Sequence, residues 1–213
     1  MKAVQKKRQS GIRVVIRLQE RMMTSRKRDL LIDTAQQLFY QQGFRATGID
    51  TILASSGVAK KTLYNHFKSK EELIVACLRR RDQQLLVLLK DKIEQFTPQQ
   101  QCELEFAPIM AFFDGLDEWI NSSAFFGCMF INASAEYHSQ DHPVHLACNE
   151  HKEAVRQLIQ QQLNGLALKD PLNLAKQLAM LADGAIVAAH TCNDATAAKR
   201  AKQMAYILLK QSL

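Results

Sequence analysis

Side chains that can donate hydrogen bonds are concentrated between positions 60 and 70 of this sequence. They include Lys60, Lys61, Thr62, Tyr64, His66 and Lys70. Leu63 and Phe67 are four residues apart, so a helix can bury both on one face and leave the donors on the other. An outward face of ammonium, hydroxyl and imidazole donors can bind phosphate oxygens and the edges of nucleic-acid bases. The segment is therefore the first candidate for a functional site.

Cap and turn signals predict the helices that would position these donors. The pattern Thr47-x-x-Asp50 predicts a capping box at the start of a helix, and Gly57 can adopt the positive φ of the sharp turn after it. Ser69-x-x-Glu72 predicts a second capping box, which opens the helix after the donor segment. A helix, a tight turn and a second helix at this spacing predict a helix-turn-helix, which places one helix in the major groove of DNA. A three-helix packing unit with a solvated basic edge is the alternative interpretation.

The same part of the chain resembles the TetR-like transcriptional regulators, densely so across residues 28–75. The resemblance rests on Ala35-x-x-Leu38-Phe39, Gly43-Phe44, Thr47, Ile49, Ile52, Ala54, Gly57-Val58, Thr62-Leu63-Tyr64-x-His66-Phe67 and Lys70-Glu71-x-Leu73. It implies an all-α protein with a three-helix DNA-binding head that contains the helix-turn-helix. A helical-bundle domain for regulation and dimerisation is implied after the head.

Two roles are expected for the donor residues. Lys60 and Lys61 lie at the start of the predicted recognition helix, so we expect them to contact base edges, with guanine as the preferred base. The starts of the neighbouring helices add main-chain amide donors for phosphates. The residues expected to bind phosphates are Thr47, Thr62, Tyr64, His66 and Lys70. The resemblance implies the same roles.

Charge is distributed unevenly along the chain. The 213 residues carry a formal net charge of +7, with 18 Lys and Arg against 6 Asp and Glu in residues 1–81 and 10 against 15 in residues 82–213. A basic part joined to an acidic part predicts a polyanion partner on one side only. No apolar run is long enough to span a bilayer, so we expect double-stranded DNA, rather than a membrane, as that partner.

Three segments are expected along the chain: a basic extension of residues 1–24, a DNA-binding head of residues 25–72, and an effector-binding and dimerisation domain of residues 73–213. Three interpretations of the extension stay open. It is a mobile arm on DNA, a disordered tail, or a stretch upstream of a true start at Met22 or Met23. The extension contains one short apolar patch, which is too short and too interrupted by charged residues to be a secretory signal. The five cysteines are scattered, which favours free thiols in a reducing cytoplasm.

Apolar periodicity predicts helices through the rest of the chain. No Gly or Pro occurs between Gly57 and Pro98, so one long helix is expected from Lys70 to about Phe96. Strict alternation of apolar and polar residues is absent, so no sheet is expected. In TetR-like proteins the long helix joins the head to the regulatory body, which makes it the expected lever for signalling. Further helices are expected near residues 102–121, 125–138, 143–163, 171–190 and 194–212.

The last two predicted helices carry stripes of small and apolar residues. Small residues allow close helix approach, and two helices from each of two chains would form a four-helix bundle. Two heads on a two-fold axis would read a palindrome, and the resemblance also implies a homodimer. An intramolecular core explains the same periodicity equally well. The residues expected at the dimer interface are Leu178, Ala182, Ala185, Ala201, Ala205 and Leu208.

Aromatic residues and methionines are concentrated between positions 106 and 137, where they could wall a drug-sized apolar pocket for an effector. The residues expected to line it are Phe106, Met110, Phe113, Trp119, Phe126, Met129, Phe130 and Tyr137. Plain core packing is the alternative for each of them. Cys128 lies in the same segment and is a candidate thiol for oxidants or electrophiles, with a small buried cysteine as the alternative.

A histidine-rich segment offers a different interpretation. Its potential ligands for zinc or nickel are spaced three or four residues apart: His138, His142, His145, Cys148 and His151. Pro143 interrupts the helix between them, so a solvated loop and helix start is favoured over a metal site. The rival function is a soluble all-α metal-binding enzyme or sensor that uses His138–His151. We find no nucleophile–base pair, phosphate loop or paired-carboxylate motif, so we expect no catalysis, no cofactor and no bound metal.

Together these patterns predict a cytoplasmic homodimer that binds a palindromic DNA operator and is released from it by a small effector, acting as a repressor. A DNA-binding architectural protein without an effector is a further alternative. The sequence identifies neither the operator, the regulated genes nor the effector, and it leaves open whether the output is repression or activation.

Overall fold

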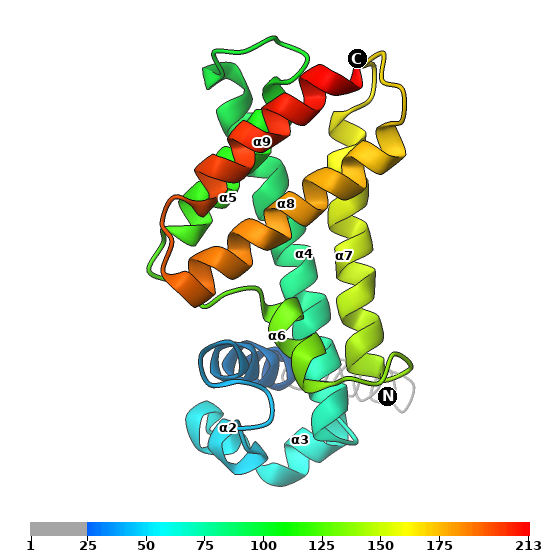
Figure 1. Ribbon diagram of the computed structural model, residues 1–213. Coiled ribbons are helices and arrows are strands. Elements are labelled where there is room, and N and C mark those ends of the chain that lie inside the picture. The colour runs from blue at the N-terminus through cyan, green and yellow to red at the C-terminus, as the bar shows by residue number, and fades with distance from the viewer. Residues whose placement is uncertain (1–24) are drawn as a thin grey trace, which may run out of the picture. The chain divides into compact units, whose positions relative to one another are not determined.

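The computed structural model describes residues 25–213, which are helical without any strand between those positions (Figure 1). The chain divides into two compact units, one ending at Cys77 and one formed by Leu78–Leu213. The boundary falls within α4, Lys70–Phe96, which matches the long helix expected from the sequence. The predicted all-α fold is confirmed. The expectations for the basic extension, residues 1–24, lie outside the described residues.

The first unit is built around three helices that precede α4. One covers residues 25–42, and it is followed by α2, Ile49–Ser56, and α3, Lys60–His66. The rings of Phe39 and Phe44 stack at 5.2 Å between centroids, where the chain leaves the first helix. Apolar side chains from every helix are buried at the centre of this unit: Leu31, Ile32, Ala35, Phe39, Phe44, Ile52, Leu63, Phe67, Leu73 and Ile74.

One of the two predicted capping boxes is wrong. The N-cap of α2 is Gly48, which has no side-chain cap, because the Thr47 hydroxyl instead donates a 2.8 Å hydrogen bond to the Gly43 carbonyl. The second box is confirmed in part: the amide of Glu72 donates to the Ser69 hydroxyl at 3.2 Å, but the Glu72 carboxylate accepts from the amide of Lys68 and not from that of Ser69. Gly57 closes α2 in the left-handed region at φ 65°, as the sharp turn requires.

The second unit contains the remainder of α4, a 3-10 turn and five further helices. The turn is Thr97–Gln99, and the helices are α5, Ala107–Ile120; α6, Met129–Glu136; α7, Pro143–Gln162; α8, Pro171–Cys192; and α9, Ala197–Ser212. Figure 1 shows α8 and α9 packed along each other, with α5 against α9 and α7 against α8. Three of these helices have a proline at one of their first two positions, where its missing N–H breaks no helical hydrogen bond.

Two helix starts lie later than the sequence indicated. The helix expected from residue 102 begins at Ala107, directly before Pro108, whose fixed φ suits the first turn. The helix expected from residue 125 begins at Met129, because Gly127 has a φ of 83° and therefore cannot continue a right-handed helix.

The apolar stripes of α8 and α9 form the core of the second unit. Most of the residues expected at the dimer interface are buried within the single chain: Leu178, Ala182, Ala185, Ala201 and Ala205, with Leu208 half-buried. Leu178 and Ala205 are fully buried, so an intramolecular core accounts for them. Ala185 and Ala201 also line an open groove between α8 and α9, so the expected dimer interface stays a prediction. By length and mean hydropathy α8 is the one helix between residues 25 and 213 that could cross a membrane, and here it packs against α7 and α9.

Candidate DNA-binding face and effector cavity

The short helix α3 is fixed in the head by its buried face. Leu63 is fully buried and Phe67, the C-cap residue, is almost so, while Lys60, Lys61 and Tyr64 are exposed on the opposite side. Burying an aromatic and an aliphatic side chain contributes about 1.5–3 kcal/mol each, enough to hold a helix too short to be stable alone. The outward donor face predicted from the sequence is therefore present.

Lys60 is the one predicted base-reading residue with a partner inside the protein. Its Nζ lies 3.3 Å from Oδ1 of Asp50, on α2, and both side chains are well exposed. Exposed ion pairs contribute only about 0.2–1 kcal/mol, so a base edge or phosphate can compete for this ammonium. Lys61 is exposed on the same helix end and has no such carboxylate beside it within the described head.

Three of the predicted phosphate-binding residues are placed differently from the sequence expectation. The Thr47 side chain is fully buried and turned toward the Gly43 carbonyl, so only its main chain is available to DNA. Nε2 of His66 is buried and has no hydrogen-bond partner among residues 25–213, and the residue as a whole is half-buried. Lys70 donates a 3.2 Å hydrogen bond to the Arg45 carbonyl, which ties the start of α4 to the loop before α2. Thr62 is half-buried.

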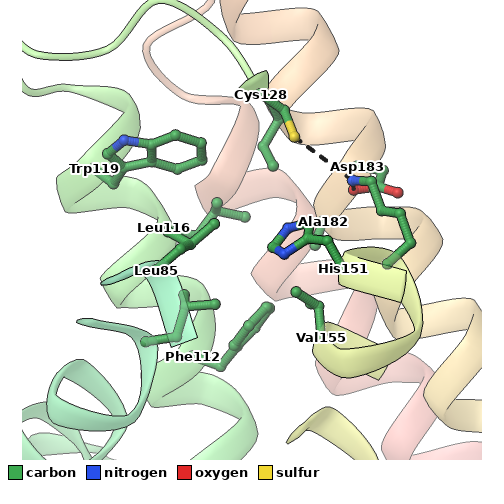
Figure 2. A pocket seen from close by; sticks show the side chains of 12 residues that line it. Leu85, Phe112, Leu116, Trp119, Cys128, His151, Val155, Ala182 and Asp183 are labelled. Atoms are coloured by element: carbon green, nitrogen blue, oxygen red, sulfur yellow. Dashed lines mark hydrogen bonds and ion pairs between the residues drawn. The ribbon is translucent and has the colours of Figure 1, made fainter. Parts of the chain in front are cut away.

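A cavity of about 30 Å³ lies inside the second unit (Figure 2). Its apolar walls come from α4, α5, α7 and α8: Leu85, Leu89, Phe112, Leu116, Trp119, Val155, Ala182 and Ile186. Ligand pockets for drug-sized molecules occupy about 300–1,000 Å³, so the cavity is closed to such a molecule in this conformation. Its position between four helices is nevertheless that of a ligand site in a helical bundle.

Of the eight residues expected to line an effector pocket, only Trp119 lines this cavity. Phe106, Met110, Phe113, Met129 and Phe130 are buried in the surrounding core, Phe126 is exposed, and Tyr137 stacks near His142. The cavity involves the stretch of chain that composition indicated, but a different face of its helices. The missed residues on α4, α7 and α8 carry no aromatic signal that would have marked them.

The cavity has one polar end, formed by residues far apart in the sequence. Nζ of Lys152, on α7, lies 2.5 Å from Oδ1 of Asp183, on α8, and 3.8 Å from Sγ of Cys128. Figure 2 shows Cys128 and Asp183 on the side of the cavity away from Leu85 and Phe112. Cys128, singled out in the sequence, is therefore a cavity residue, and it is 4% exposed.

His151 forms another polar part of the lining and connects it to α4. Its Nδ1 lies 2.7 Å from Oδ1 of Asp82, and its ring stacks on Phe130 at 3.5 Å between centroids. Burial lowers the pKa of this imidazole below its usual value, and the hydrogen bond to Asp82 opposes that effect only in part. Lys152 also disfavours the protonated form, whereas Asp183 favours it.

This pKa predicts a pH dependence of stability. A base with a lowered pKa in the folded state binds fewer protons there than in the unfolded state, so stability is fully present above the usual pKa of 6.5 and falls as pH drops below it. Urea unfolding between pH 7 and 5 measures how the free energy of unfolding depends on pH. His151 contributes at most about 1.4 kcal/mol per pH unit to that slope. The His151→Gln variant, which keeps a donor for Asp82, is expected to show a shallower slope. Equal slopes in the two proteins would contradict this assignment.

The potential metal ligands of the histidine-rich segment do not converge. Nδ1 of His142 accepts a hydrogen bond from the amide of Val144 and caps α7, while Nδ1 of His145 lies 3.0 Å from the Tyr137 carbonyl. Burial raises the pKa of the Cys148 thiol to about 12, far above what a metal thiolate needs. Within residues 25–213 no group of three or more His, Cys, Asp or Glu is arranged to hold a metal ion.

An exposed donor helix, held by buried apolar residues and preceded by a left-handed glycine turn, defines a helix-turn-helix DNA-binding protein. The family model "Bacterial regulatory proteins, tetR family" matches residues 31–77, which include this motif. The chain is 34% identical over 97 residues to the HTH-type transcriptional activator FasR of Mycolicibacterium smegmatis, covering 46% of this chain and 43% of FasR. The chain thus spans less than half the length of that relative.

Two further comparisons extend beyond the head. The HTH-type transcriptional regulator YjdC of Escherichia coli is 24% identical over 160 residues, covering 75% of this chain and 81% of YjdC. The crystal structure of SCO4454, a TetR-family transcriptional regulator from Streptomyces coelicolor, matches with a TM-score of 0.76 at 28% identity, covering 88% of this chain and 96% of that chain. Residues 31–77 thus match the DNA-binding head of the TetR family, and the described chain resembles TetR-family transcriptional regulators in sequence and fold.

Proposed function

We propose that this protein represses transcription by binding a palindromic DNA operator as a cytoplasmic homodimer, and that a small effector releases it. The observation that carries the DNA part is the exposed face of α3, on which Lys60, Lys61 and Tyr64 stand opposite the buried Leu63. A short helix alone gives modest affinity, whereas two heads on a two-fold axis add their contacts at half-sites about one helical turn apart. All five cysteines are free thiols, which supports a reducing compartment.

The dimer we propose uses the outward faces of α8 and α9 rather than their buried stripes. Apolar side chains stand on these faces without cover in the single chain: Met180, Val187, Met204 and Ile207. A groove of about 240 Å³ runs between them and is lined by Gly184, Ala188 and Ala201, whose small size permits close helix approach. A contiguous exposed apolar surface on two long helices is typical of a protein interface.

The proposed DNA contacts follow from the exposed residues. Lys61 is our first candidate for a base-edge contact, and Lys60 joins it once its ammonium leaves Asp50. Tyr64 and Thr62 are proposed to bind phosphates with their side chains, Thr47 with its main chain only. Lys70 is proposed to bind a phosphate while it stays tied to the Arg45 carbonyl, since an ammonium has three donors.

Two alanine variants distinguish a lysine that contacts DNA bases from a lysine that binds the DNA phosphate backbone. Lys61→Ala is expected to weaken the preferred operator about 10-fold and to relax its sequence preference, because a base contact discriminates by about 1–3 kcal/mol. Lys70→Ala is expected to weaken all DNA sequences alike and to lower the slope of log K against log salt by about 1. Fluorescence anisotropy with operator and scrambled duplexes at several salt concentrations measures both. An unchanged salt slope in Lys70→Ala would overturn the phosphate role.

We propose that the effector releases the protein from DNA by displacing α4. Leu85 and Leu89 of this helix line the cavity, and Asp82 is hydrogen-bonded to His151, so a molecule that widens the cavity must displace α4 contacts. The effector shifts a population only if it binds the wider state better than the closed one. In this scheme residues 25–72 read DNA and residues 73–213 bind the effector and the second subunit.

Oxidation or alkylation of Cys128 is a second proposed route of release. The Lys152 ammonium lies 3.8 Å from its sulfur, at the polar end of the cavity. The sulfur is buried, so only a reagent that reaches the cavity meets it.

A further inference from the structure

We infer that the effector is an amphipathic organic anion, whose carboxylate takes the place of Asp183 on Lys152 while its apolar body enters the cavity. The inference rests on the proposed function, since it names the chemical class of the molecule that would release the protein from DNA. It is carried by two spaces that share one ion pair: the closed inner cavity and an open groove on the surface of the same unit.

The outer groove lies between α7 and α8 and has a volume of about 370 Å³. Lys152, Val155 and Asp183 line both this groove and the inner cavity. The ion pair between Lys152 and Asp183 therefore stands at the boundary between water and the apolar interior. A molecule that passes from the groove into the cavity has to replace one member of that pair.

The groove contains more positive than negative side chains. Lys152, Arg156 and Lys176 line it, against Glu153 and Asp183. Glu153 is already bound by two nitrogens of Arg156, and this hydrogen bonding lowers the pKa of its carboxyl. Lys176 lines the same groove, where its charge contributes to the lowered pKa of Glu153, and Nη1 of Arg156 is buried without a hydrogen-bond partner in the part of the chain that the structure describes. The excess of positive charge and this unused donor favour a negatively charged ligand.

The geometry of this ion pair favours a ligand that replaces Asp183 over a ligand that replaces Lys152. The Lys152 ammonium is held by both Asp183 and Cys128, whereas Asp183 pairs only with Lys152 among residues 25–213 and is 41% exposed. Asp183 can return to water when another carboxylate arrives, and Lys152 stays neutralised throughout. A cationic ligand would instead have to drive the ammonium of Lys152 away from the sulfur and would meet Arg156 and Lys176 on its way.

The apolar body follows from the walls of the cavity. Beyond the ion pair the lining is aliphatic and aromatic, with His151 as the next polar group, itself bonded to Asp82. Transfer of alkyl or aryl groups from water to such a lining is favourable by about 25 cal/mol per Å². The cavity must widen to accept them, because it holds about 30 Å³. A small hydrophilic anion therefore binds only at Lys152, at the entrance to the cavity. It does not displace α4, because it has no apolar body to enter the cavity.

The test compares four probes on the full-length protein: octanoate, 1-octanol, octylammonium and acetate. Thermal unfolding and isothermal titration measure binding in the absence of DNA, and anisotropy of a labelled operator measures release. Octanoate is expected to raise the Tm and to weaken operator binding at least 10-fold. The uncharged, cationic and headgroup-only probes are expected to do neither at the same concentration. Binding of octylammonium or octanol as tight as that of octanoate would overturn the inference.

Three variants give the sharper readout. Lys152→Met is expected to lower octanoate affinity at least 10-fold, while Lys90→Met, an exposed lysine of α4 outside both spaces, leaves it unchanged. Asp183→Asn removes the competing carboxylate and is expected to raise octanoate affinity about 3- to 10-fold, a gain that general damage to the fold cannot produce. Weaker octanoate binding in Asp183→Asn would contradict the proposal that the ligand carboxylate replaces Asp183 on Lys152.

Two outcomes separate this inference from the proposed function. Octanoate binding without operator release would support the ligand class and contradict effector release. Operator release by a different class of molecule, with no octanoate binding, would leave the proposed function standing and overturn the inference.

Discussion

The double variant Met180→Asp/Met204→Asp is expected to be monomeric and to bind its operator about 1,000-fold more weakly than the unaltered protein. Both methionines stand on the proposed dimer face, 72% and 53% exposed in the single chain. Two carboxylates placed there would be desolvated on association, opposite the same charges of the second subunit. A monomer has only one DNA-binding head, so it loses the gain in operator affinity of about 10²–10⁴ that the second head provides, while α3 itself is unaltered.

Sedimentation or light scattering measures the subunit mass, and anisotropy measures operator affinity on the same sample. Leu104→Asp is the matched control, because Leu104 is 92% exposed and lies outside both α8 and α9. It is expected to remain dimeric with unchanged affinity. A double variant that stays dimeric would refute this face as the interface. A monomer that still binds the operator tightly would refute the need for two heads.

Gly115→Ala is expected to lower the free energy of unfolding by about 2 kcal/mol and to change operator affinity as well. Gly115 lies in α5, where an added Cβ would come within 2.7 Å of Cβ of Lys92 on α4. A Cβ cannot rotate away, so the two helices must separate, and overpacking of this kind costs about 1–3 kcal/mol. The better helix propensity of alanine offsets less than about 1 kcal/mol of that cost.

A double-mutant cycle isolates this contact. In a Lys92→Gly background the same Gly115→Ala change is expected to be neutral or stabilising, because the opposing Cβ is gone. Urea unfolding measures each free energy. An equal cost of Gly115→Ala in both backgrounds would show that α4 and α5 tolerate the closer approach, and α4 would then lose its role as a tightly fitted lever.

The head was predictable because its signals are local in the chain. The spacing of Leu63 and Phe67, the left-handed Gly57 and the cap formed by Ser69 and Glu72 each act over a few residues, and the structure contains all of them. Thr47 is the exception. Its hydroxyl had two partners within reach, the N-terminus of α2 and the Gly43 carbonyl, and burial of the residue selected the carbonyl.

The candidate effector site was not predictable in the same way. Lys152 meets Cys128 and Asp183 across 24 and 31 residues of sequence, so no spacing rule connects them. Richness in aromatic residues indicated the stretch between positions 106 and 137, yet only Trp119 of the eight predicted residues lines the cavity. The others fill the core around it, because periodicity identifies a buried face but not which neighbour that face meets.

By itself the sequence determined the all-helical fold, the length of α4 and the DNA-reading motif, since each depends on contacts between residues close in the chain. Only the tertiary structure decided that the small-residue stripes of α8 and α9 are buried inside one subunit and that Met180 and Met204 remain outside. It also decided that a lysine, an aspartate and a cysteine meet at the cavity. The physical reason is that an amphipathic helix has one preferred buried side, while its packing partners depend on how helices distant in the sequence fit together.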